Sequence, residues 1–134
     1  MARASATSAP VEVCWTLVGQ RRGRVWYARR VRRTLGERAC VAFDGPWALD
    51  REERRHDVLG FFHTHPDGPP VPSHRDVRTM RAWRLAFGKP LLCLIDGPAG
   101  LRGFRFDNDE STGEPLAIVE AFPRGAVIGV DAHG

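Results

Sequence analysis

The sequence has no apolar run long enough to cross a membrane. Its longest runs, such as Leu91 to Ile95, are short, whereas a membrane-spanning helix needs about 18 to 20 consecutive apolar residues. Residues 1–9 are rich in alanine, serine and threonine and lack the apolar segment of a secretory signal. The composition therefore predicts a soluble, cytoplasmic protein with no membrane partner, in which residues 1–9 are disordered.

Cysteine and lysine are both scarce. The three cysteines, Cys14, Cys40 and Cys93, are an odd number, and each lies in an apolar run without the spacing of a metal site. We therefore expect reduced thiols in the core of a cytosolic protein. Lys89 is the single lysine among 20 basic residues, so the net charge of +4 is carried by arginine.

Arginine is concentrated in one segment. Eight arginines lie between Arg21 and Arg38, a density found both on nucleic-acid-binding surfaces and on solvated faces of β-hairpins. Arginine alternates imperfectly with apolar or aromatic residues over residues 24–35, which favours a strand with one solvated face. Nucleic acid is therefore not the preferred partner.

The length and apolar content allow one core. At 134 residues with 43% hydrophobic side chains, the chain is expected to form one domain over residues 10–134. Residues 20–23 are expected to be a turn, and residues 38–43 are expected to pair with residues 24–35 as a hairpin. The predicted strands are residues 11–19, 24–35, 38–43, 58–65, 91–95, 101–106, 116–122 and 126–130.

One principal helix is expected after a proline-rich loop. Ser73 can cap it, apolar residues recur at steps of three or four from Val77 to Phe87, and Gly88 ends it. Residues 50–57 are too charged and too short to predict more than a surface turn or one helical turn. The order of elements predicts an α/β fold, a sandwich with a mixed sheet and this one helix.

Two histidines and an aspartate flank that loop. His63 and His65 are two residues apart on a predicted strand, so their imidazoles point to one face. Asp76 lies in the first turn of the helix, where its carboxylate can turn back toward them. Two imidazoles and one carboxylate suit zinc and leave one tetrahedral position for water. The pattern predicts a catalytic zinc site, which needs a carboxylate base nearby.

The spacing around these residues is specific. The chain reads His63-Thr64-His65-Pro66, then six residues, then Ser73-His74-Arg75-Asp76, and Pro10-Val-Glu12-Val-Cys14 stands upstream. In both segments the chain resembles the JAMM (MPN+) family of JAB-domain zinc metalloproteases, and its deubiquitinase-like bacterial members in particular. The likeness covers residues 10–106.

The resemblance implies a fold and a set of roles. The fold is the MPN/JAB fold, a mixed sheet of the cytidine deaminase-like type, with one zinc ion per chain held by His63, His65 and Asp76. Glu12 aligns with the catalytic base, which takes a proton from water and returns it to the leaving amine, and Ser73 would donate a hydrogen bond to the oxyanion. The implied substrate is a ubiquitin-like protein or its conjugate, cleaved after the C-terminal glycine. Activating and conjugating enzymes from the same operon are implied partners.

Some features depart from the family pattern and leave alternatives open. Family members usually carry a helix before the glutamate segment, and residues 1–9 are too few for a full one, so the fold could be truncated or completed by a partner. Glu37, Glu52 or Glu53 could replace Glu12 as the base. A non-catalytic MPN scaffold and a DNA-repair-associated JAB-like protein are the alternative functions.

Overall fold

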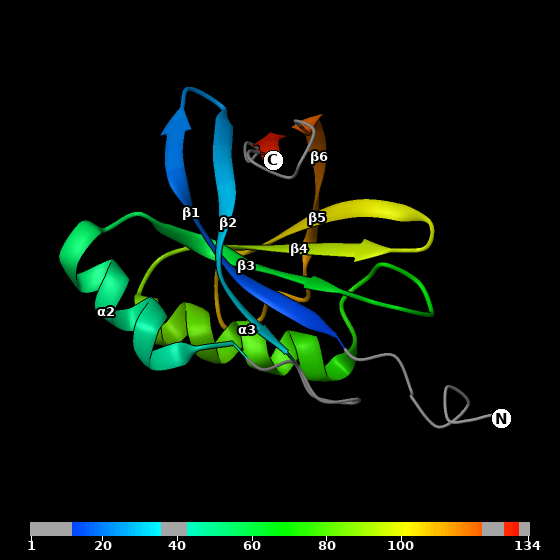
Figure 1. Ribbon diagram of the computed structural model, residues 1–134, viewed down its shortest axis with the longest axis horizontal. Helices are drawn as coiled ribbons and strands as arrows, with labels where there is room; N and C mark the ends of the chain where they lie inside the picture. The colour runs from blue at the N-terminus through cyan, green and yellow to red at the C-terminus, as the bar shows by residue number, and fades with distance from the viewer. Residues whose placement is uncertain (1–11, 36–42, 122–127, 132–134) are drawn as a thin grey trace, which may run out of the picture.

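The computed structural model of the chain describes residues 12–35, 43–121 and 128–131. The described residues form a β-barrel with two helices on one side (Figure 1). The elements are β1 (Val13–Arg22), β2 (Val25–Leu35), α2 (Gly45–Arg55), β3 (Val58–Thr64), α3 (His74–Phe87), β4 (Leu91–Gly97), β5 (Gly100–Phe106), β6 (Glu114–Ala121) and β7 (Ile128–Asp131).

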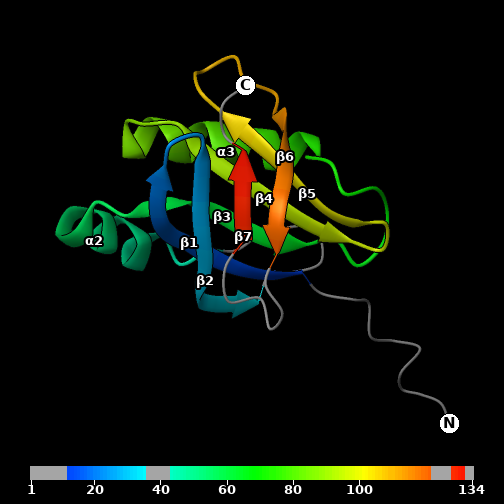
Figure 2. The same cartoon turned by 90° about the horizontal axis from the view of Figure 1, so that it is seen from above.

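The strands form one closed sheet in the order β1-β2-β7-β6-β5-β4-β3. Strands β3 and β4 are parallel, and the other neighbouring pairs are antiparallel, so the predicted mixed sheet is confirmed. The sheet is not an open layer of a sandwich, because β7 pairs with both β2 and β6 and closes the barrel on the side away from the helices (Figure 2).

The first two strands form a hairpin that is longer than predicted. Strand β1 continues through the expected turn to Arg22, which pairs with Val25, and Gly23 adopts the positive φ of 62° that this tight turn requires. The predicted hairpin partner at residues 38–43 lies outside the described residues except for Phe43, which is not in a strand.

The helix α2 corrects the expectation of a single turn at residues 50–57. Asp44 caps its first turn by accepting a hydrogen bond from the backbone N–H of Trp47 at 3.2 Å, and Pro46 lies where a helix tolerates proline. Ala48 is fully buried. The Asp-Gly-Pro segment that reads as a strand break is therefore also a helix start, and of the charged residues after it, Asp50, Glu53, Arg54 and Arg55 are exposed.

The helix α3 confirms the predicted principal helix and its ends. Ser73 is the N-cap: its hydroxyl accepts from the backbone N–H of Asp76 at 3.1 Å, while the Asp76 carboxylate accepts from the backbone N–H of Ser73. Gly88 ends the helix in the left-handed conformation with φ 70°. This reciprocal capping fixes the orientation of the Asp76 side chain.

Two clusters of apolar side chains lie on opposite faces of the sheet. Phe62 belongs to one, with Leu17, Leu94 and residues of β7, and its neighbour Phe61 belongs to the other, which packs against Met80 of α3. Because successive strand residues alternate in direction, His63 emerges on the helix side with Phe61. No helix among the described residues is both long and apolar enough to span a membrane.

Two of the three cysteines lie in the described residues. Cys14 and Cys93 are both buried and neither forms a disulfide, as expected for reduced core thiols. Burial raises the pKa of the Cys93 thiol well above its ordinary value, so this thiol stays protonated. Cys40 lies outside the described residues.

Candidate metal centre

The two histidines lie at the end of β3, where three strands meet. His63 pairs with Cys14 of β1 and with Ile95 of β4, and only 1% of its surface is exposed. His65 follows the last strand residue, and its backbone N–H donates to the carbonyl of Asp96 at 2.9 Å. Both imidazoles are therefore carried on backbone that is held by neighbouring strands.

Three side-chain atoms converge at this point. The Nε2 atoms of His63 and His65 are 3.0 Å apart, and Asp76 Oδ2 lies 3.3 Å from the first and 3.1 Å from the second. Zinc holds nitrogen and oxygen ligands at about 2.0–2.1 Å, which places tetrahedral donor atoms about 3.3 Å from one another. The donor set and its spacing fit a zinc ion.

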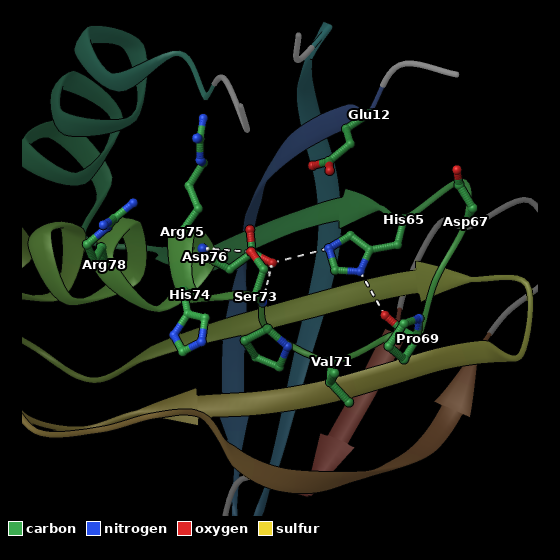
Figure 3. Close-up of a pocket in the computed structure, with 11 residues that line it drawn as sticks. Glu12, His65, Asp67, Pro69, Val71, Ser73, His74, Arg75, Asp76 and Arg78 are labelled. Atoms are coloured by element: carbon green, nitrogen blue, oxygen red, sulfur yellow. Dashed lines mark hydrogen bonds and ion pairs between the residues drawn. The ribbon is translucent and has the colours of Figure 1, made fainter. Parts of the chain in front are cut away.

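Hydrogen bonds to the backbone orient two of these side chains. His65 Nδ1 lies 3.0 Å from the carbonyl oxygen of Pro69, so Nδ1–H donates there, and Nε2, which faces Asp76, is the ring nitrogen that can bind either a proton or a metal ion. Asp76 Oδ2, the atom that faces the histidines, also accepts from the backbone N–H of Ser73 at 2.9 Å. Figure 3 shows both contacts.

The Asp76 carboxylate is ionised. Its burial alone would raise its pKa, but hydrogen bonds with His63 and His65, together with the Ser73 amide, hold the pKa far below the ordinary value. The hydrogen bond with Asp76 in turn raises the pKa of His65. An ionised carboxylate between two imidazoles is an attractive position for a divalent cation.

Glu12 lies beside this group, immediately before β1. Its ligand oxygen and the ring nitrogens of His63 and His65 all lie within 4.8 Å of one another. Glu12 Oε1 is buried and has no hydrogen-bond partner within the described part of the chain. Burial raises the pKa of Glu12, and the two histidines only partly oppose this. Asp76 is thus the closer and more acidic carboxylate, and Glu12 is the one better able to accept and hold a proton.

A cavity of about 580 Å³ opens over these residues. Its volume is in the range of small-molecule and cofactor sites, roughly 300–1,000 Å³. Arg75 and Arg78, to which the sequence patterns assigned no role, also line it and bring positive charge to the cavity. The lining is Glu12, His65, Asp67, Pro69, Val71, Pro72, Ser73, His74, Arg75, Asp76 and Arg78 (Figure 3).

Ser73 lines this cavity while serving as the N-cap of α3. Its Oγ is engaged as an acceptor by the Asp76 amide, which leaves the hydroxyl hydrogen able to donate to another group. The capping role is confirmed. The role of oxyanion donor stays a prediction.

The other glutamates considered as the base lie elsewhere. Glu52 accepts hydrogen bonds from Lys89 and from the backbone of Val58, and Glu53 is exposed on α2. Neither lines the cavity. Glu37 lies outside the described residues.

Comparison with known proteins identifies the family of the chain. Residues 1–107 match the family described as prokaryotic homologs of the JAB domain. A desampylase from Pyrococcus furiosus is 33% identical over 98 residues, which cover 70% of this chain and 65% of that protein. The chain thus spans less than two thirds of the length of this relative. The family match covers most of the chain and includes every residue of the centre described above, so the protein belongs to the family of prokaryotic homologs of the JAB domain.

Proposed function

We propose that the protein is a zinc-dependent hydrolase that cleaves the bond after the C-terminal glycine of a ubiquitin-like protein, in a conjugate or a precursor. The observation that carries the proposal is the convergence of His63, His65 and Asp76 beside a buried Glu12 oxygen, which has no hydrogen-bond partner among residues 12–35, 43–121 and 128–131. The desampylase relative supports hydrolysis as the type of reaction.

The proposed metal ligands are His63 Nε2, His65 Nε2 and Asp76 Oδ2, one zinc ion per chain. Such an ion would polarise the scissile carbonyl and lower the pKa of water, so that hydrolysis proceeds at neutral pH. The hydrogen bonds from His65 to Pro69 and from Ser73 to Asp76 hold two of the three ligands in position before binding.

Glu12 is the proposed general base. Its raised pKa and partly buried position allow its carboxylate to take a proton from water and then deliver it to the leaving amine. Ser73 would donate its hydroxyl hydrogen to the oxygen of the carbonyl under attack. Both residues line the cavity that the substrate tail would enter.

The scaffold and DNA-repair alternatives explain less of the site. A module that only binds a partner has no need to bury a carboxylate oxygen such as that of Glu12, which accepts no hydrogen bond from the part of the chain that the structure describes, because such burial costs free energy. A DNA-binding role would need only a surface rich in arginine, such as the segment between Arg21 and Arg38. It would not explain why His63, His65 and Asp76 converge.

The test uses the full chain loaded with zinc and a panel of ubiquitin-like proteins fused through the C-terminal glycine to a reporter peptide. Glu12→Gln should retain one zinc per chain and lose cleavage by about 100-fold or more. Asp76→Asn should bind zinc far more weakly. Glu53→Gln, which changes an exposed glutamate of α2, is the matched control and should cleave like the wild type. Full cleavage by Glu12→Gln would refute the assignment of the base.

A further inference from the structure

A side chain between the two histidines contacts the segment that carries Glu12. The hydroxyl oxygen of Thr64 accepts a hydrogen bond from the backbone N–H of Val13 at 2.9 Å, across 51 residues of sequence. Thr64 stands between His63 and His65, and Val13 follows Glu12 directly. One hydrogen bond therefore joins the backbone of the proposed base to the strand of the proposed ligands.

This bond occurs where the backbone pairing of β1 with β3 ends. The ladder runs from Val18 and Val58 to Cys14 and His63. The next step would bring Val13 opposite Thr64, but the Val13 N–H is taken by the threonine hydroxyl instead. After Thr64 the backbone still pairs with β4, because the His65 N–H donates to the carbonyl oxygen of Asp96. The Thr64 side chain thus continues the connection between β1 and β3 for one more residue.

The position suits threonine for two reasons. A β-branched side chain has few χ1 rotamers in a strand, so its hydroxyl is held in one direction. The hydroxyl also supplies the acceptor that a half-buried backbone N–H requires. Valine has nearly the same shape but no acceptor, and serine has the acceptor with less restriction of χ1.

We propose that Thr64 is a positioning residue, which sets the place of the Glu12 carboxylate relative to His63 and His65 through the Val13 amide. The inference rests on the proposed function in taking Glu12 as the base. Glu12 is only one residue from the hydrogen-bonded amide, so a shift of this backbone moves its carboxylate. A displacement of about 1 Å in a catalytic group can reduce the rate about 100-fold.

Thr16 of β1 provides a matched control. It is a threonine in the same sheet, 1% exposed, and its hydroxyl oxygen has no hydrogen-bond partner within the described residues. Thr16→Val therefore makes the same chemical change as Thr64→Val without removing a hydrogen bond to the Glu12 segment.

The experiment compares Thr64→Val, Thr64→Ser and Thr16→Val in the full chain. Thr64→Val should keep one zinc per chain and a KM within about twofold of the wild type, while kcat falls about 10- to 100-fold. The kcat of Thr64→Ser should lie within a few fold of the wild-type value, and the kcat of Thr16→Val should equal the wild-type value.

Two further measurements do not depend on hydrolysis. Hydrogen exchange at the Val13 amide of the metal-free protein should be faster in Thr64→Val, but not in Thr64→Ser or Thr16→Val. The visible spectrum of the cobalt-substituted protein should change in Thr64→Val in the same direction as in Glu12→Gln.

The outcomes separate this proposal from the proposed function. If the wild type cleaves nothing, the proposed function fails, and the exchange rates and cobalt spectra still decide whether Thr64 places Glu12. Faster Val13 exchange with unchanged kcat and an unchanged cobalt spectrum would overturn the positioning role. A Thr64→Ser variant whose kcat is as low as that of Thr64→Val would also overturn it. The serine keeps the hydroxyl acceptor, so the hydrogen bond to Val13 would then not be what sustains kcat.

Discussion

His65 shows how one residue of the centre can present a candidate ligand nitrogen while its other ring nitrogen fixes the orientation of the ring. Its Nδ1 donates to the Pro69 carbonyl, and its Nε2 lies 3.1 Å from Asp76 Oδ2. The spacing of the histidines and Asp76 in the sequence predicts that these side chains converge. It does not predict the Pro69 contact, because the path of a proline-rich loop depends on what the loop packs against.

The raised pKa of His65 predicts a pH dependence of zinc binding. Hydrogen bonding to Asp76 raises this pKa above the ordinary value of about 6.5. Below the raised pKa, His65 binds a proton at the nitrogen that zinc needs, so zinc affinity should fall as the pH falls through it. Calorimetric titration with zinc from pH 8 to pH 5.5 should show this loss. An affinity that stays constant over the range would contradict the role of His65 as a ligand.

At the scale of elements, the sequence predicts α3 and most strands but misses α2. The signals for α3 are local: a capping serine, a periodic apolar face and a terminal glycine. The start of α2 is also local, yet Asp44-Gly45-Pro46 reads equally well as the end of a strand. What decides between the readings is the burial of Ala48 against the sheet, which a sequence pattern does not show.

The junction of α2 and β3 carries an ion pair whose effect on stability can be measured. Arg51 donates to both carboxylate oxygens of Asp57 at 2.9 and 2.7 Å, and this contact lowers the pKa of Asp57. Asp57→Asn should lower the free energy of unfolding by about 1 kcal/mol near pH 7. Chemical denaturation would measure the difference.

The pH dependence of that difference has a definite sign. Because the folded-state pKa of Asp57 is depressed, the stabilisation is present above the unfolded-state pKa of about 3.9 and is lost as the pH falls through the lower folded-state value. The exposed pair of Arg54 with Asp50 is the control, and Asp50→Asn should have little effect. Equal effects of the two substitutions at pH 7 would contradict this account.

At the scale of the whole molecule, the centre depends on three segments that the barrel brings together. Glu12 precedes β1, His63 and His65 lie at the end of β3 and just after it, and Asp76 lies in the first turn of α3. The proposed metal ligands could be predicted from local spacing, whereas Glu12 could be proposed as the base only through the likeness to a family. The contact of Thr64 with Val13 could not be predicted, because no local pattern states that β1 lies beside β3.

X-ray absorption spectroscopy of the zinc-loaded full chain tests the metal centre most directly. We expect one zinc per chain with only nitrogen and oxygen ligands at about 2.0–2.2 Å, two of them imidazoles. The buried thiols of Cys14 and Cys93 should not contribute. A chain that retains no zinc, or a spectrum with sulfur ligands at about 2.3 Å, would contradict the assignment of His63, His65 and Asp76.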